Sequence, residues 1–212
     1  MKILSSKLLI LSFVVITANS CTLFKKNISR PINIAINEQA FTATLNSTAV
    51  NAKYITLVSS GQIAEAFLKG FKSEGDNTVN VTMINTEENA DFIIKLSSLE
   101  IKESSNVQKI NNSKSTYNGL EVILNTVECT ASVEIINVKK NTKSTFNALN
   151  SKSRSEKEKN NRTLLDLIVG TNKDNTQYRT KTLSDHICVN LAEDVGRRIW
   201  TPITRKIARN LK

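Results

Sequence analysis

The chain has 212 residues, with 29 lysines and arginines against 19 aspartates and glutamates, one histidine and three cysteines. This length suits one domain that is large enough to bury a core, and the positive charge favours anionic partners such as lipid headgroups, acidic glycans or an acidic protein face. One histidine and scattered cysteines do not supply the clustered ligands of a zinc site. No cofactor is therefore expected.

The first twenty residues have the pattern of an export signal. Lys2 and Lys7 precede an apolar run, residues 8–16, which at about nine residues is too short to span a bilayer. The small residues of "ANSC", residues 18–21, fit ordinary secretory cleavage and also look like a bacterial lipobox. Both readings predict cleavage of the same bond, and in the second Cys21 is lipidated and becomes the first residue of the mature chain.

The cysteine count favours lipidation over plain secretion. An exported protein with Cys21, Cys129 and Cys188 as thiols would carry an odd number into an oxidising compartment, whereas lipidation of Cys21 leaves an even pair. An unlipidated secreted protein and an uncleaved anchor are the alternatives. Thr22 follows Cys21, whereas a lipoprotein retained in the inner membrane would carry aspartate there. In this respect the chain resembles lipoproteins that are sorted to the outer membrane and face the periplasm.

Removal of residues 1–20 as a signal peptide leaves 192 residues, in which 27 basic and 19 acidic side chains give a formal charge of +8. Residues 21–30 are predicted to be a lipidated tether, and residues 31–212 a single domain. Within that domain we expect long polar loops at 104–118 and 150–181.

The first part of the domain alternates between strands and one helix. Short patterns of period two predict strands at 31–37 and 52–59. Ser59 and Gln62 have the spacing of a capping box, so a helix is expected to begin there and to end at Gly75.

Further strands are predicted at 79–84, 90–103, 120–138 and 144–155. The apolar phase slips at residues 97–98 and again near Asn125, which suggests a bulge at each place. Between Val127 and Ile135 every second residue is apolar, a pattern typical of an antiparallel strand with one wet face.

The C-terminus is predicted to be an amphipathic helix from Leu183, capped by Thr182 or Ser184. A break or kink is expected at Trp200–Pro202, with a short second helix continuing to Leu211. The predicted fold class is α+β: a mostly antiparallel sheet with one helix after the first strands and a C-terminal helix packed on one face.

This order of elements resembles small bacterial outer-membrane lipoproteins: the activators of penicillin-binding proteins, the curli-secretion lipoproteins and the lipopolysaccharide-assembly lipoprotein. The resemblance is carried by "ANSC" (18–21), "QIAEAFLKGFKSE" (62–74), "ADFIIKLSSLEIKE" (90–103) and "LAEDVGRRI" (191–199). It implies an envelope protein without catalytic activity. It offers no motif through which functional residues could be transferred.

No catalytic residue is predicted. His186 follows Asp185 directly, and adjacent helical residues point about 100° apart, so "SDH" cannot assemble a catalytic relay. Glu87, Glu88 and Asp91 are expected in a solvated turn, and Gly170 stands alone, without a phosphate-binding loop. We therefore expect that the chain is not an enzyme.

Two segments are candidate contact surfaces. An apolar group within a polar region could meet a membrane or partner, or could form a short docked helix: Leu164, Leu165, Leu167 and Ile168. A basic group near the C-terminus could meet an anionic surface, or could be a solvated helix end: Arg197, Arg198, Arg205, Lys206 and Arg209.

Cys129 lies on the apolar face of its strand and Cys188 in the apolar arc of the C-terminal helix. In a two-layer fold these surfaces pack together, so a disulfide between them is predicted. The alternative is that each cysteine is a small buried packing residue.

The leading functional hypothesis is an outer-membrane-anchored, non-catalytic structural or regulatory component of an envelope assembly or secretion machine, with an envelope protein as partner. The alternative is a periplasmic binding module for an anionic glycan or lipid, such as lipopolysaccharide or peptidoglycan. An envelope location argues against nucleic acid as a partner. A contiguous basic face with a groove would favour the alternative.

Lipidation of Cys21 can be tested directly. Mass spectrometry of the mature protein from membrane fractions should show an N-terminal cysteine carrying two or three acyl chains. A free, unmodified Cys21 in that fraction would rule the anchor out.

Overall fold

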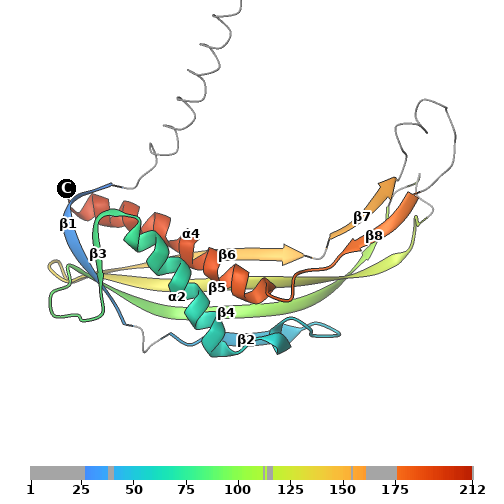
Figure 1. Ribbon diagram of the computed structural model, residues 1–212, viewed down its shortest axis with the longest axis horizontal. Helices are drawn as coiled ribbons and strands as arrows, with labels where there is room; N and C mark the ends of the chain where they lie inside the picture. The colour runs from blue at the N-terminus through green and yellow to red at the C-terminus, as the bar shows by residue number, and fades with distance from the viewer. Residues whose placement is uncertain are drawn as a thin grey trace, which may run out of the picture.

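The computed structural model describes residues 27–37, 41–111, 113, 117–153, 155–160 and 176–211. Figure 1 shows two helices on one side of a long, curved sheet. The elements are β1 (Asn27–Ile36), β2 (Thr44–Thr48), the 3-10 turn η2 (Ile55–Leu57), α2 (Ser60–Asp76), β3 (Val79–Ile84), β4 (Phe92–Lys109), β5 (Glu121–Asn137), β6 (Thr142–Ser153), β7 (Ser155–Asn160), β8 (Thr176–Lys181) and α4 (Ile187–Asn210).

The main sheet has the strand order β3-β1-β4-β5-β6, and β2 pairs with a later part of β4. The pairs β4–β5 and β5–β6 are antiparallel, whereas β1–β3, β1–β4 and β2–β4 are parallel, so the sheet is mixed. β7 and β8 pair separately as an antiparallel ribbon. The predicted α+β class, with one helix after the first strands and a C-terminal helix on one face, is confirmed.

Helix α2 begins at the predicted capping box. The Ser59 hydroxyl accepts a hydrogen bond from the Gln62 backbone N–H, and the Gln62 side chain accepts one from the Ser59 N–H at 2.8 Å. Two backbone donors at the helix start are thereby satisfied. Ile63, Phe67 and Phe71 are fully buried along one stripe of the helix, as their spacing predicts.

The two helices touch through their backbones at Gly70 and Gly196. A Cβ atom on Gly70 would overlap the carbonyl oxygen of Glu193, and one on Gly196 would overlap the carbonyl oxygen of Phe67. Beside this crossing, Lys69 Nζ of α2 lies 3.1 Å from the Glu193 carboxylate of α4. Only glycine permits so close an approach.

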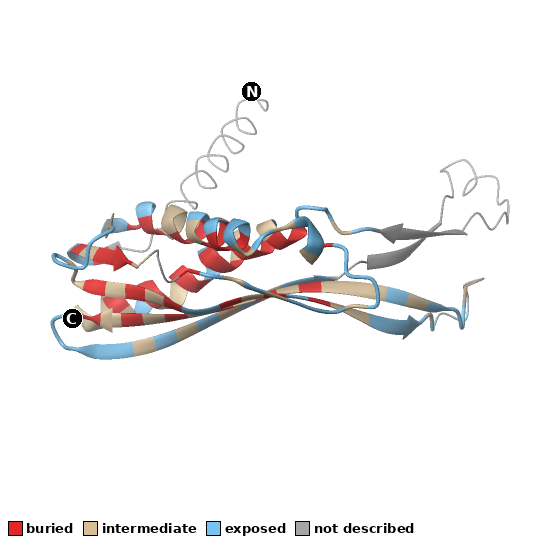
Figure 2. Ribbon diagram, turned by 90° about the horizontal axis from the view of Figure 1, so that it is seen from below, coloured by how far each residue is buried: buried red, intermediate tan, exposed pale blue. Residues whose placement is uncertain are grey.

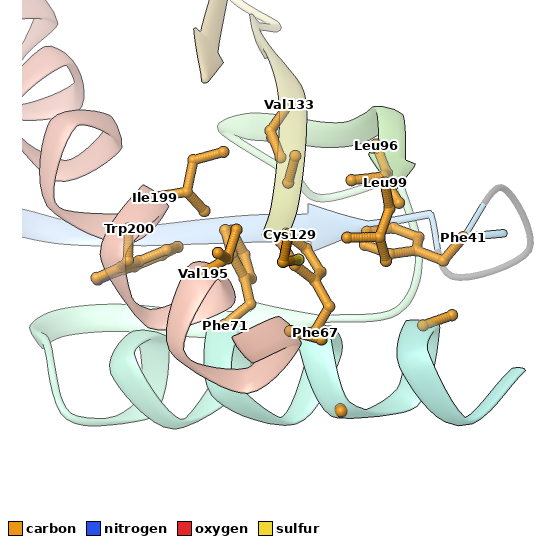
Figure 3. Close-up of a cluster of buried hydrophobic side chains, with 14 of the residues drawn as sticks. Phe41, Phe67, Phe71, Leu96, Leu99, Cys129, Val133, Val195, Ile199 and Trp200 are labelled. Atoms are coloured by element: carbon orange, nitrogen blue, oxygen red, sulfur yellow. The ribbon is translucent and has the colours of Figure 1, made fainter. Parts of the chain in front are cut away.

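An aromatic cluster fills the space between the helices and the sheet (Figure 3). The fully buried Trp200 meets Phe71 edge to face, with ring centroids 4.9 Å apart. Its indole N–H donates to the Thr78 hydroxyl at 2.8 Å, so the one polar atom of this side chain is satisfied inside the core. The inward-facing residues of β5, Val127 to Ile135, alternate as predicted and form the floor of the cluster.

The predicted strand at 52–59 is wrong. Glu103, on β4, is fully buried, and its carboxylate accepts three backbone N–H bonds: from Lys53 at 3.0 Å, Tyr54 at 2.9 Å and Ile55 at 3.1 Å. Three successive N–H groups that converge on one carboxylate curl the chain into the turn η2. The sequence pattern of 52–59 could not show this, because the carboxylate lies some fifty residues away.

The first part of the predicted loop at 104–118, residues 104–109, is strand. β4 continues to Lys109 and β5 starts at Glu121, and the ladder between them keeps its register from Ser98 to Lys109. The bulge at 97–98 is confirmed by a register shift after Leu96, but no shift occurs near Asn125. A ladder satisfies backbone donors whatever the side chains are, so polar residues can extend it beyond the core.

The other predicted boundaries also need correction. Within the predicted loop at 150–181, β6 runs on to Ser153, and β7 and β8 are strands. The tether ends earlier than predicted, because β1 starts at Asn27 and Ile28 is buried in the core.

Helix α4 is continuous through Pro202, so the predicted separate second helix is not formed. The Thr204 hydroxyl lies within hydrogen-bonding distance of the carbonyl oxygens of Trp200 and Thr201, at 3.2 and 3.0 Å. Buried residues on both sides of the proline hold the two halves against the sheet. Among the described residues, no helix is long and apolar enough to cross a membrane.

The glycine crossing predicts a contrast between two substitutions. Gly196→Ala should lower the free energy of unfolding by about 2–3 kcal/mol, because the new methyl group meets backbone atoms that cannot move independently. Gly61→Ala should be neutral or stabilising by up to about 1 kcal/mol, since its Cβ would have no neighbour closer than the Ser59 hydroxyl at 3.9 Å. Urea denaturation of both variants measures the difference, and equal midpoints would contradict the close packing.

Candidate functional site

A shallow hollow of about 390 Å³ lies at the end of the sheet where β4 begins. Its walls come from β1, the start of β4, the turn between β5 and β6, and the last turn of α4. Polar and charged residues contribute most of its lining: Arg30, Asp91, Asn137, Lys139, Lys140 and Asn210. Figure 1 shows the end of α4 beside β1 in this region.

The one carboxylate of this basic hollow is already engaged. Asp91 forms an ion pair with Arg30 at 3.3 Å and accepts the Asn33 backbone N–H at 2.9 Å. Asp91 therefore joins β1 to the start of β4, whereas the sequence predicts only a solvated turn there. Because Asp91 balances Arg30, the exposed Lys139 and Lys140 leave the hollow with a net positive charge.

The two lysines of the hollow differ in their contacts. Lys140 Nζ donates to the Asn210 carbonyl oxygen at 3.0 Å, and its backbone N–H bonds the buried Asn137 side chain at 2.9 Å. These bonds fix the turn against the end of α4. Among the described residues, Lys139 forms no ion pair.

The predicted basic group on α4 is not one uniform surface. Arg197 pairs with Glu193, and Arg198 pairs with Asp194 at 2.6 Å. A hydrogen bond from Lys69, together with the nearby cations, holds the pKa of Glu193 below its usual range, so this carboxylate stays charged. Two of the five predicted cations are thus neutralised locally. The others lie further along the helix: Arg205, Lys206 and Arg209.

At the far end of β4 the β4–β5 ribbon extends past both helices. We call residues 104–110 and 120–126 the arm. Figure 2 shows buried positions giving way to intermediate and exposed ones along this ribbon. Val107 and Ile123 are cross-strand partners and remain 66% and 49% exposed, and Leu120 is 54% exposed.

Several predicted site residues lie outside the described part of the chain. These are the lipidation site and the apolar group of 163–170: Cys21, Leu164, Leu165, Leu167 and Ile168. Their predicted roles therefore stay predictions.

The two remaining cysteines lie on packed surfaces, as predicted. α4 packs on β5, and both Cys129 and Cys188 are buried. They are free thiols, however, so the predicted disulfide is not formed in this structure. Burial raises the pKa of Cys129 to about 12 and that of Cys188 to about 11, which suits the alternative of two packing residues.

The described residues hold no group of three or more His, Cys, Asp or Glu side chains that could bind a metal ion. His186 is exposed at the start of α4. Its neighbour Asp185 pairs with Lys53 at 2.9 Å, and this hydrogen bond lowers the pKa of Asp185. The backbone N–H of His186 donates to the Ser184 hydroxyl at 3.2 Å.

Sequence reasoning missed both the basic hollow and the arm. Lys139 and Lys140 lie between the predicted strands at 120–138 and 144–155, and Arg30 lies in the predicted tether. Val107 and Ile123 fell in a predicted loop and in an irregular strand end. A doubled lysine in a hairpin turn was the only local signal, and it does not show that α4 and β1 lie beside it.

Comparison with known proteins does not assign the chain to a family. No protein-family model matches it, and no curated protein does. Similar solved structures include a Helicobacter pylori protein assigned as a neuraminyllactose-binding hemagglutinin homologue, with 8% identity, a TM-score of 0.41 and 86% of each chain covered. A hypothetical protein from Chlamydia trachomatis has 9% identity and a TM-score of 0.37, with 84% of this chain and 98% of that chain covered. A Caulobacter crescentus protein assigned as a lipoprotein has 9% identity and a TM-score of 0.25, with coverage of 82% and 94%.

The burial of Cys129 and Cys188 predicts slow alkylation of both thiols in the folded protein. In the reduced, folded protein at pH 8, iodoacetamide should modify Cys129 and Cys188 at least about 100-fold more slowly than in urea, because the thiolate is the nucleophile. Because the thiol pKa values are higher in the folded chain, they contribute to the free energy of unfolding. This contribution is complete below about pH 9 and is lost as the pH rises towards 11–12. Peptide mapping measures both sites, and rapid modification of the folded chain would contradict their burial.

Proposed function

We propose that this chain is a lipid-anchored protein of the bacterial outer membrane that acts as a non-catalytic structural or regulatory component of an envelope assembly, and that the arm contacts its partner protein. The observation that carries the proposal is the exposed apolar pair of Val107 and Ile123 on a ribbon that projects past the helices.

The arm concentrates apolar surface that a folded chain normally buries. Of the eight large apolar side chains that are exposed in the described residues, three lie here: Val107, Leu120 and Ile123. Single exposed apolar residues are ordinary, whereas adjacent ones on a projecting element are typical of a protein contact. Because about half to two thirds of each side chain is exposed, burying the remainder against a partner would contribute about 1–2 kcal/mol per residue.

The geometry separates this contact from the anchor. β4 has 18 residues, and its first, Phe92, lines the basic hollow, whereas its last, Lys109, lies in the arm. At about 3.3 Å per residue the strand has a contour of roughly 60 Å. Arg30, close to the predicted tether, also lines the hollow. In a chain anchored through Cys21, the arm would therefore lie at the end of β4 that is farther from the anchor.

A periplasmic binding module for an anionic glycan or lipid is the second candidate. The observation in its favour is the basic hollow, together with the exposed Arg205 and Arg209. The ion pairs of Arg197 and Arg198 count against α4 as one continuous anionic-ligand surface. We therefore favour the protein contact through the arm over the anionic-ligand module.

Site-specific photo-crosslinking in intact envelopes tests the proposal. A photoreactive residue in place of Val107 should give a discrete protein adduct, and Ile123→Thr should reduce that adduct at least about fivefold, because it removes apolar surface but keeps a β-branched side chain. The matched control is the same photoreactive residue in place of Val138, which is 44% exposed and lies at the opposite end of β4 from the arm, where its backbone N–H bonds the Asp91 carbonyl oxygen.

The thermal midpoint of the Ile123→Thr variant should stay close to that of the parent, because exposed substitutions usually change stability by less than about 0.5 kcal/mol. An equal adduct from positions 107 and 138, or none from 107, would exclude the arm as the contact.

A further inference from the structure

We propose that the basic hollow is a binding site for the phosphate of an anionic lipid headgroup, and that it sets how the domain sits on the membrane that holds its anchor. This inference goes beyond the proposed partner contact. It depends on residues at the opposite end of β4 from the arm, so the two can fail independently.

The charge of the hollow suits one phosphate. Asp91 has both oxygens engaged, one by Arg30 and one by the Asn33 backbone N–H. Arg30 uses a second N–H for the Pro31 carbonyl at 3.2 Å, and a guanidinium has five donors, so several remain. Lys139 adds a cation that has no ion-pair partner among the described residues.

The C-terminal end of α4 disfavours binding of an anion, because the last carbonyl groups of a helix carry partial negative charge. Lys140 offsets this effect by donating to the Asn210 carbonyl oxygen at 3.0 Å. An ammonium group has three N–H donors, so this bond leaves two. The net result is a polar hollow in which Arg30, Lys139 and Lys140 all retain donors for phosphate oxygens.

The position of the hollow favours a membrane lipid over a soluble phosphate. Arg30 lies three residues after Asn27, and only residues 22–26 separate Asn27 from the predicted lipidated Cys21. The six residue-to-residue steps from Cys21 to Asn27 span at most about 20 Å, so an anchored domain would keep this end within reach of the headgroups. Tethering at that range raises the effective concentration of headgroups greatly. Lys25 and Lys26 add positive charge in the same stretch of sequence.

Vesicle co-sedimentation tests the site without the acyl anchor. The full mature chain carrying Cys21→Ser is mixed with phosphatidylcholine vesicles that contain either no phosphatidylglycerol or about 30 mol% of it. We expect binding only to the anionic vesicles. Lys139→Gln with Lys140→Gln should weaken that binding about 10–30-fold at an ionic strength of about 0.1 M, since each cation near an anionic surface contributes about 1 kcal/mol.

The matched control is Lys102→Gln with Lys152→Gln, which removes the same charge from exposed positions of β4 and β6. It should weaken binding less than about threefold, because Lys102 lies ten strand residues, or roughly 30 Å, from Phe92 of the hollow, and the effect of a charge decays within about a Debye length. Equal losses for both pairs would overturn the proposal in favour of non-specific attraction by net charge. Absence of binding to anionic vesicles would also overturn it.

Inorganic phosphate separates the two sources of the ligand. At about 10 mM, with ionic strength held constant, it should leave vesicle binding nearly unchanged if many headgroups compete from one surface. Saturable phosphate binding by calorimetry, without any binding to anionic vesicles, would show that the hollow takes a soluble phosphate and would overturn the lipid assignment. Unchanged urea midpoints for both double variants show that they are folded.

Discussion

The backbone contact between Gly70 and Gly196 determines how the two layers of this protein fit together. Where the helices touch, the carbonyl oxygens of Phe67 and Glu193 occupy the space that side chains would otherwise fill. Because α2 and α4 lie so close, both apolar stripes reach the same sheet face, and Phe71 can meet Trp200 edge to face. A wider spacing would leave a void in the aromatic cluster, and voids in cores cost stability roughly in proportion to their volume.

Glu103 is a second constraint, and it marks a boundary. Its carboxylate is fully buried yet satisfied by three backbone N–H groups, so the cost of removing the charge from water is offset by charge-assisted hydrogen bonds. Glu103 pairs with Val127, and both are fully buried, whereas the residues beyond them on each strand are at least partly exposed. The same side chain therefore holds the turn before α2 and stands where the covered sheet becomes the arm.

The features that could be predicted from sequence are those that neighbouring residues determine. The capping box of Ser59 and Gln62, the bulge at 97–98 and the alternation from Val127 to Ile135 depend on local spacing, and the structure contains all three. The turn η2 depends on Glu103, and the hollow depends on contacts such as Lys140 with Asn210, which join residues far apart in the chain. The continuity of α4 through Pro202 depends on packing against the sheet, which outweighs the local preference of proline for a helix start.

The folding stability of the arm depends less on the identity of its side chains than the stability of the two-layer body does. In the body, replacing Gly196 or Glu103 disturbs atoms that other elements need in place. In the arm, the ladder from Ser104 to Lys109 pairs backbone with backbone, and its side chains have little role in holding the fold. Residues there can change with little cost in folding free energy. Substitutions on the surface that faces outwards from this end therefore cost the fold little, whereas substitutions at the glycine crossing or at the buried carboxylate behind it disturb the packing of the whole body.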